Sequence, residues 1–210
     1  MYLGGICFIT DRKASALSCE AMTRAVLRGG EQWIQYREKE RSRREIFEEA
    51  VRLRRLTKNS NAIFIVNDYV DIALSVDADG VHLGQEDLPL SEAWKIMGRD
   101  RIIGVSTHDL EQAIEAERGG ADYIGFGPVF HTMTKDAGSP KGVDMLREVK
   151  KQVTIPVVAI GGINLENVRS VLDAGADAVA VASAMLKGDI EKNTRLFMKI
   201  IRSYSLSVHK

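Results

Sequence analysis

The stretch RGGADYIGF, Arg118 to Phe126, decides the fold because variants of it recur along the chain. RGGEQWIQ (28–35), SVDADGVHL (75–83) and DAGADAVAV (173–181) all run from a helix end, through Gly or Asp, into a short apolar segment. Glycine at a helix C-terminus followed by a tight turn explains this order. The repeat therefore predicts a scaffold in which helices and strands alternate.

Short apolar runs lie between amphipathic helical patterns, which is typical of βα units on a parallel sheet. Eight such runs predict a closed barrel, so we expect a single-domain (βα)8 TIM barrel of the α/β class over residues 1–210. The predicted strands are Ile6–Thr10, Trp33–Tyr36, Ala62–Val66, Gly80–Leu83, Ile102–Val105, Tyr123–Phe126, Val157–Ile160 and Ala178–Val181.

Two charged segments are predicted to be helices of the outer ring. Arg41 to Lys58 carries an apolar stripe at helical spacing, which favours a solvated outer helix over a nucleic-acid-binding patch. A last helix, from about Ile190 to Tyr204, closes the ring.

The composition excludes several classes of protein. The 210 residues carry 29 basic and 29 acidic side chains, so no overall field attracts nucleic acid or an anionic membrane. The apolar runs are shorter than a membrane-spanning helix and the Met1 end lacks a secretion signal, so we expect a cytoplasmic protein. Cys7 and Cys19 have the spacing of neither a zinc site nor a disulfide framework. A homo-oligomer is left open.

The chemistry of such a barrel is expected at the carboxyl ends of its strands. After the second strand come Gln35, Arg37 and Lys39, which share one face if the strand continues that far. Arg can grip a diphosphate through two hydrogen bonds, while Lys supplies a compact charge. The alternative is a basic loop tip that pairs with Glu38 and Glu40.

Carboxylates follow the next two strands. Asn67 and Asp68 come directly after the third strand, and the stretch GVHLGQEDLP places Asp87 after the fourth. Two carboxylates from neighbouring strand ends could hold one Mg²⁺ together with phosphate oxygens. The alternative is that Asn67 or Asp68 caps the following helix, and that Asp87 caps the helix that starts near Pro89.

The fifth and sixth strands lead into hydroxyl-bearing segments. Ser106 could donate to a phosphate, whereas Thr107 or Asp109 could cap the next helix, and we expect His108 to be a surface or supporting residue. The long loop from Phe126 to Gly142 carries two threonines and a lysine, which suits an oxyanion ligand that is covered during reaction. Those loop residues are Thr132, Thr134 and Lys135.

Bare backbone amides follow the last two strands. Gly161 and Gly162 precede one helix, and Ala182 and Ser183 precede another. Adjacent strand ends of this kind form the recurrent phosphate site of the barrel. Many barrels share it, so it predicts a phosphate without saying which one.

Taken together, these motifs resemble the thiamine phosphate synthase (thiamine-phosphate diphosphorylase) family, and the match runs from near the first strand to the eighth. Seven motifs occur in the family's order. They are QYREK (35–39), Asn67 with Asp68, DGVHLGQED (79–87), GVSTH (104–108), GPVFHTMTK (127–135), AIGGI (159–163) and Ala182 with Ser183.

The resemblance implies a transferase of thiamine biosynthesis that joins a hydroxymethylpyrimidine diphosphate to a thiazole phosphate. In the family the diphosphate leaves first and the thiazole nitrogen captures the resulting pyrimidine carbocation. The resemblance places Gln35, Arg37, Lys39, Asn67, Ser106 and Lys135 at the pyrimidine diphosphate and Asp68 and Asp87 on Mg²⁺. It places Thr132, Thr134, Gly162, Ala182 and Ser183 at the thiazole phosphate.

One residue departs from the family pattern, because His131 stands where Pro is expected. The nearest rival is a paralogous thiazole tautomerase, which shares the barrel. That subgroup has His where Pro128 stands in this chain, and it tends to lose the diphosphate and metal residues. A non-catalytic phosphate-binding barrel, which needs no paired carboxylates, is the rival from another class.

Overall fold

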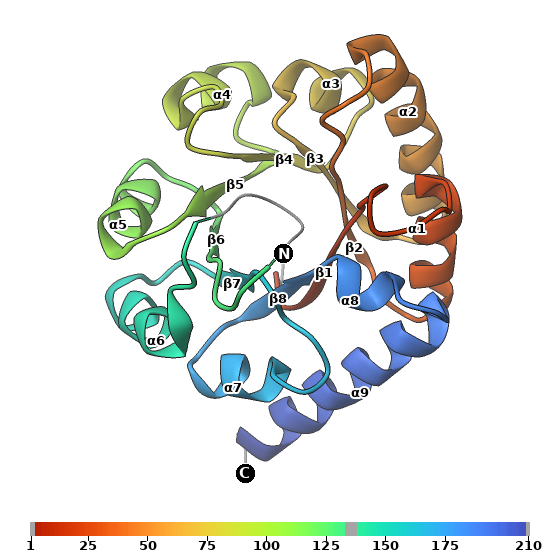
Figure 1. The fold of residues 1–210 in the computed structure, drawn as a ribbon. Coiled ribbons are helices and arrows are strands. Elements are labelled where there is room, and N and C mark those ends of the chain that lie inside the picture. Colours follow the sequence, from red (N-terminus) through yellow and green to blue (C-terminus); the bar gives the residue numbers. More distant parts are fainter. Residues whose placement is uncertain (1–2, 133–137, 209–210) are drawn as a thin grey trace.

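Parallel strands form the centre of the molecule and pair in chain order until β8 meets β1, which closes the barrel (Figure 1). The computed structural model describes residues 3–132 and 138–208, and this architecture is that of those residues. The predicted (βα)8 barrel is therefore confirmed. The strands are β1 (Gly5–Ile9), β2 (Trp33–Tyr36), β3 (Ile63–Asn67), β4 (Gly80–Leu83), β5 (Ile102–Thr107), β6 (Tyr123–Phe126), β7 (Val157–Ile160) and β8 (Ala178–Val181).

The strand ends differ slightly from those predicted. β1 and β3 are each displaced by one residue, and β5 runs to Thr107 instead of Val105. Ser106 and Thr107 belong to β5 because they pair with Gly125 and Phe126 of β6. A strand end depends on what its neighbour offers, which the local pattern does not contain.

Helices surround the barrel as an outer ring, as Figure 1 shows. The segment expected to be an outer helix begins with a capping box in which Ser42 and Glu45 exchange hydrogen bonds. The helices are α1 (Cys19–Arg28), α2 (Arg43–Asn59), α3 (Val70–Ser75), α4 (Leu90–Met97), α5 (Leu110–Arg118), α6 (Gly142–Gln152), α7 (Val168–Asp173), α8 (Ser183–Leu186) and α9 (Ile190–Val208).

The glycines of the sequence repeat end helices. Gly30, Gly120 and Gly175 have φ of 98°, 84° and 95°, and Asp77 holds the same place in the repeat with φ of 56°. A left-handed residue turns the chain back toward the sheet after each of these helices. The repeat therefore reflects one turn geometry used several times.

Aspartates of the same repeat join neighbouring strands. Oδ2 of Asp79, Asp122 and Asp177 accepts a backbone N–H from Phe64, Ile103 and Val157, over 2.7 to 2.8 Å. Each carboxylate precedes one strand and binds the start of the strand before it. These bonds satisfy backbone donors at the barrel floor, opposite the strand ends that carry the predicted site.

Two layers of apolar side chains hold the barrel together. Ile6, Phe8 and Phe64 belong to the layer between strands and helices, whereas Trp33 and Tyr123 belong to the layer inside the barrel. The rings of Trp33 and Tyr123 meet edge to face with centroids 5.3 Å apart. Cys7 and Cys19 are free and buried.

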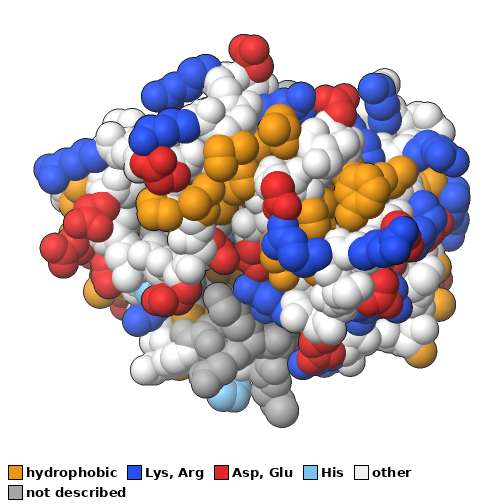
Figure 2. Space-filling view, turned by 90° about the horizontal axis from the view of Figure 1, so that it is seen from above, with side chains coloured by type: hydrophobic (Ala, Val, Ile, Leu, Met, Phe, Trp, Pro, Cys, Tyr) orange, Lys and Arg blue, Asp and Glu red, His pale blue; other side chains and the backbone are white. Residues whose placement is uncertain are grey.

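The face seen from above in Figure 1 carries a band of apolar side chains between charged ones (Figure 2). Exposed large apolar residues of α2, α3 and α4 include Phe47 and Val51 of α2, Leu74 of α3 and Ile96 of α4. Contiguous apolar surface of this kind is what an interface between proteins buries.

Within the described residues, no helix combines the length and the apolar character needed to span a membrane.

Candidate active site

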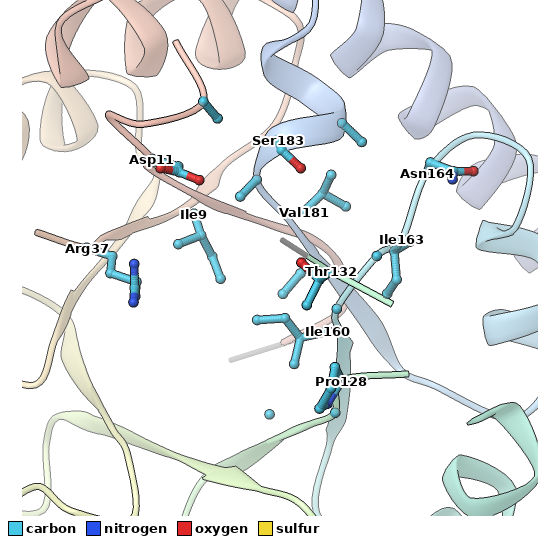
Figure 3. A pocket seen from close by; sticks show the side chains of 18 of the residues that line it. Ile9, Asp11, Arg37, Pro128, Thr132, Ile160, Ile163, Asn164, Val181 and Ser183 are labelled. Atoms are coloured by element: carbon cyan, nitrogen blue, oxygen red, sulfur yellow. The ribbon is translucent and has the colours of Figure 1, made fainter. Parts of the chain in front are cut away.

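A cavity of about 520 Å³ opens at the carboxyl ends of the strands. Figure 3 shows Arg37 on one side of it and Thr132 and Ser183 on the other, with Ile9 and Ile160 between them. The side that carries Arg37, called the cationic side below, therefore faces a hydroxyl-bearing side across apolar walls, and Asp11 also lines the cavity between Arg37 and Ser183. That arrangement suits two polar groups joined through a less polar centre.

Arg37 lines the cavity from the loop after β2 and is held by its backbone. Its N–H donates to Oγ1 of Thr10 over 3.0 Å, and the same hydroxyl donates to its carbonyl oxygen over 3.3 Å. Thr10 is fully buried at the end of β1. β2 ends at Tyr36, so Arg37 and Lys39 are placed by this loop and not by continued strand alternation.

Glu38 and Glu40 do not neutralise the predicted basic cluster, contrary to the loop-tip alternative. Glu38 lies 3.0 Å from Nε of Arg12 and accepts the backbone N–H groups of Lys39 and Glu40. Glu40 pairs instead with Lys13. The acidic residues shape the loop, and the Arg37 side chain is directed to the cavity.

Lys39 and two carboxylates meet at the ends of β3 and β4. Nζ of Lys39 lies 2.6 Å from Oδ2 of Asp68. Burial, followed by a hydrogen bond and charge repulsion from Asp87, raises the pKa of Asp68, while Lys39 opposes the rise. The structure therefore brings together the three residues predicted at a diphosphate and its metal.

Neither carboxylate acts as a helix cap, so that alternative is wrong. The residue before α3 is Tyr69 and the residue before α4 is Pro89, and neither helix has a side-chain cap. Asp87 accepts the backbone N–H of Gly84 over 2.6 Å, and Asp68 has the left-handed φ of 68°. Aspartate adopts this conformation more readily than most residues, as Asp77 also does, so it fits the tight turn that follows β3.

The donor set fits a magnesium ion. Within residues 3–132 and 138–208 there is no group of three or more His, Cys, Asp or Glu placed to hold a metal. Asp68 and Asp87, however, repel each other, and a divalent cation between them would relieve that repulsion. Mg²⁺ commonly takes one or two carboxylates and completes its shell with phosphate oxygens and water.

A chain of polar side chains crosses the barrel interior to Ser106. Nε2 of His82 lies 2.9 Å from Oγ of Ser106, and Nδ1 of His82 lies 2.9 Å from the hydroxyl of Tyr123. Tyr123 also hydrogen-bonds the side chain of Gln35, which is buried at 4% exposure. Burial raises the pKa of Tyr123 well above its usual value. Sequence reasoning assigned Gln35 and Ser106 but gave no role to the two residues between them.

Asn67 is the last residue of β3 and is buried, with its backbone paired to His82 in β4. This places it beside Asp68 at the strand end, as predicted.

The hydroxyl-bearing side of the cavity brings together residues from three loops. Gly162 has φ of 65°, and a Cβ there would lie 2.4 Å from the carbonyl oxygen of His131. Only glycine therefore allows the loop after β7 to approach the loop after β6 so closely. Thr132, Gly162, Ala182 and Ser183 all line the cavity, whereas Thr134 and Lys135 lie outside the described residues.

His108 also lines the cavity, and sequence reasoning had expected only a surface or supporting residue. Its Nδ1 lies 2.7 Å from the carbonyl oxygen of Gly127, so Nδ1 carries the proton. Asp109 beside it caps α5 through the backbone N–H of Gln112, as one alternative predicted. Further lining residues that sequence reasoning missed are Thr10, Lys13, Asn164 and Lys187. The sequence carries a recognisable pattern only for lining residues that directly follow a strand.

The family model and the similar curated sequences indicate the same family. The family model described as thiamine monophosphate synthase matches residues 6–185. The thiamine-phosphate synthase of Methanosarcina barkeri is 46% identical over 196 residues, covering 92% of this chain and 89% of that protein. That of Halalkalibacterium halodurans is 50% identical over 188 residues, covering 89% and 87%.

A solved structure agrees with these sequence matches. The thiamine phosphate pyrophosphorylase from Pyrococcus furiosus superposes with a TM-score of 0.88 at 44% identity, covering 95% of this chain and 96% of that one. The family-model match, over residues 6–185, runs from β1 into α8 and contains every strand end described above. This chain belongs to the thiamine monophosphate synthase family.

Proposed function

We propose that the protein joins 4-amino-5-hydroxymethyl-2-methylpyrimidine diphosphate to 4-methyl-5-(2-hydroxyethyl)thiazole phosphate and releases thiamine phosphate and diphosphate. The observation that carries this proposal is the two-sided cavity, with Arg37 facing Thr132 and Ser183 across apolar walls. Each substrate has one phosphorylated end, and the bond forms between their ring systems. A cavity that holds an anion at each end positions the two rings to meet in the middle.

The pyrimidine diphosphate is assigned to the side that carries the cationic residues. Arg37 and Lys39 offer charge to the leaving diphosphate, and Ser106 lines the same cavity. Asp68 and Asp87 would hold a magnesium ion, which supplies electrostatic stabilisation of the departing diphosphate. Gln35, Asn67 and Lys135 complete the proposed set.

The thiazole phosphate is assigned to the opposite side. Thr132 and Ser183 supply hydroxyl groups, while Gly162 and Ala182 leave backbone groups accessible because they lack bulky side chains. Thr134 completes this set in the proposal. Oxyanions are commonly bound by such backbone amides and hydroxyls in this barrel.

The residues fit a dissociative substitution. The carbon–oxygen bond to the diphosphate breaks first, the electron pair leaves with diphosphate, and the thiazole nitrogen then donates its lone pair to the pyrimidine carbocation. The tertiary ring nitrogen carries no proton, so no general base is needed for the attack. Ile9, Ile160 and Val181 line the cavity and would shield the cation from water.

Two rival functions are weaker. Members of the tautomerase subgroup have His at the position of Pro128 and tend to lose the diphosphate and metal residues. In this chain Pro128 lines the cavity and the Lys39–Asp68 pair is retained. A non-catalytic phosphate-binding barrel has no use for Asp68 and Asp87 placed against each other.

The test is to incubate the pure protein with Mg²⁺ and both phosphorylated precursors and to measure thiamine phosphate and diphosphate. Equal amounts of the two products are expected. The double variant Asp68→Ala with Asp87→Ala should form none, while Asp100→Ala, which removes an exposed carboxylate before β5, should match the wild type. Undiminished product from the double variant would contradict the mechanism.

A further inference from the structure

We propose that Tyr123 and His82 are positioning residues that orient the hydroxyl of Ser106 as a hydrogen-bond donor toward the diphosphate. This inference rests on the proposed function, because it concerns the anion bound at the cationic side of the cavity. It assigns roles to two buried polar residues that neither the metal site nor the phosphate subsite uses.

The three residues lie on neighbouring strands of one wall. His82 is on β4, Ser106 on β5 and Tyr123 on β6, and the register pairs His82 with Gly104 and Ser106 with Gly125. His82 is 7% exposed and Tyr123 is 1% exposed, whereas Ser106 lines the cavity. Of these three residues, Ser106 is the one that lines the cavity, so His82 and Tyr123 would act on a ligand through its hydroxyl.

Glycine neighbours make room for the imidazole. A Cβ at Gly125 would lie 3.1 Å from Cε1 of His82, and a Cβ at Gly104 would lie 2.1 Å from Cζ of Tyr123. The residue beside each ring is therefore glycine, because a Cβ there would crowd the ring. Side chains packed this closely have little freedom to choose other hydrogen-bond partners.

The number of protons on each group fixes the direction of the hydrogen bonds between Tyr123, His82 and Ser106. A serine hydroxyl has one proton, so Ser106 can donate to a ligand only if it accepts from Nε2 of His82. A neutral imidazole that donates through Nε2 accepts through Nδ1, and Nδ1 must then receive the phenolic proton of Tyr123. Tyr123 thus sets the tautomer of His82, which sets the direction of Ser106.

The chemistry of the ligand selects between the two directions. A diphosphate oxygen only accepts hydrogen bonds, so the productive chain is Tyr123 to His82 to Ser106 to ligand. Gln35 is the first residue of this hydrogen-bonded series, and its amide N–H can donate to the Tyr123 oxygen. Hydrogen bonds aligned in one direction polarise and strengthen one another.

Tyr123→Phe is the primary test, because it removes one hydroxyl and retains the ring. We expect kcat to fall roughly tenfold or more, since a hydrogen bond to the leaving group is weakened, while KM for the thiazole phosphate is unchanged. The variant with Ser106→Ala added should be no slower than Ser106→Ala alone. Independent, multiplying losses would overturn the proposal.

Two substitutions of His82 separate positioning from packing. His82→Gln can place an N–H near the Nε2 position, whereas His82→Asn reaches only the Nδ1 position. We expect the Gln variant to retain more activity at equal folded content, measured by thermal unfolding. Equal losses in the two variants would contradict a donor role for Nε2.

A spectroscopic measurement tests the tautomer without any turnover. Nitrogen NMR of histidine-labelled protein, with inorganic diphosphate and Mg²⁺ added and His82→Gln used for assignment, should show a proton on Nε2 of His82. Tyr123→Phe should change the proton distribution between the two nitrogens. An unprotonated Nε2 in the wild type would overturn the inference even if thiamine phosphate is formed. If Nε2 is protonated, the inference stands even if no thiamine phosphate is formed.

Discussion

Nζ of Lys39 lies 2.6 Å from Oδ2 of Asp68, which joins the loop after β2 to the end of β3. The lysine is half exposed and the carboxylate is nearly buried. Lys39 offsets part of the repulsion between Asp68 and Asp87. The pair therefore links the proposed metal position to the proposed diphosphate position.

Replacing Lys39 should weaken the pyrimidine diphosphate side alone. In Lys39→Ala we expect KM for the pyrimidine diphosphate to rise about tenfold, as one charge-assisted contact is lost, and KM for the thiazole phosphate to stay unchanged. Steady-state kinetics with each substrate varied in turn measures the split. Lys95→Ala removes an exposed lysine paired with Glu92 on α4 and is the matched control. A parallel rise in both KM values would argue against the assignment.

Thr10→Val should disturb Arg37 without changing its side chain. Valine has the shape of threonine, but it leaves the N–H and carbonyl of Arg37 without their partner, at a cost of about 1–3 kcal/mol. We expect a lower melting temperature and reduced kcat/KM for the pyrimidine diphosphate. Thr57→Val removes an equally buried hydroxyl, bonded to Arg54 within α2, and should lower stability without affecting activity. Equal kinetic effects of both substitutions would refute the clamp.

Gly162→Ala should damage the thiazole phosphate side. The added methyl would lie 2.4 Å from the carbonyl oxygen of His131, so one of the two loops must move. We expect KM for the thiazole phosphate to rise at least about tenfold, because a displaced amide no longer meets the phosphate. Gly98→Ala also places a side chain at a positive φ, 73°, but with open space around it, and should leave KM unchanged. An unaltered KM in Gly162→Ala would show that this loop does not hold the phosphate.

Glu31 should make stability depend on pH. Burial raises the pKa of Glu31 to about 7, from an ordinary value of 4.5, although it accepts N–H groups from Gln32 and Trp33. Because the folded-state pKa is the higher one, the folded protein binds more protons between about pH 4.5 and 7. Stability contributed by this group is present at low pH and is lost as pH rises through that window, by roughly 3 kcal/mol in all.

Glu31→Gln tests this linkage, since the amide oxygen can still accept both N–H groups. We expect the variant to be more stable than the wild type at pH 8, with the difference shrinking toward pH 4.5. Urea unfolding at several pH values measures it. A difference that does not change with pH would contradict the raised pKa.

The strands were predictable because each is a local pattern that recurs. Gly30, Gly120 and Gly175 end helices with the same left-handed turn, so one stretch such as RGGADYIGF describes several βα units. The carboxyl end of β5 was not predictable, because Ser106 and Thr107 become strand only through their pairing with β6, whereas its start at Ile102 was predicted correctly. Element type followed from local sequence, and element length followed from the neighbour.

The site was predictable in its location but not in its contacts. Arg37, Asp68, Asp87 and Ser183 were identified because they are polar and follow buried strands. Polar side chains at such positions are costly unless a ligand or another partner meets them. The sequence left open whether Asp68 and Asp87 cap helices, and the structure excludes it. Caps and ligands use the same residue types, so composition cannot separate the two roles.

By itself, the sequence determined a (βα)8 barrel and predicted that its polar residues gather at the carboxyl ends of the strands, since periodicity and turn chemistry act over a few neighbouring residues. Only the tertiary structure decided that Lys39 pairs with Asp68 and that His82 joins Tyr123 to Ser106. These contacts link residues from different βα units. Closure of the barrel sets their distances, and no local pattern records that closure.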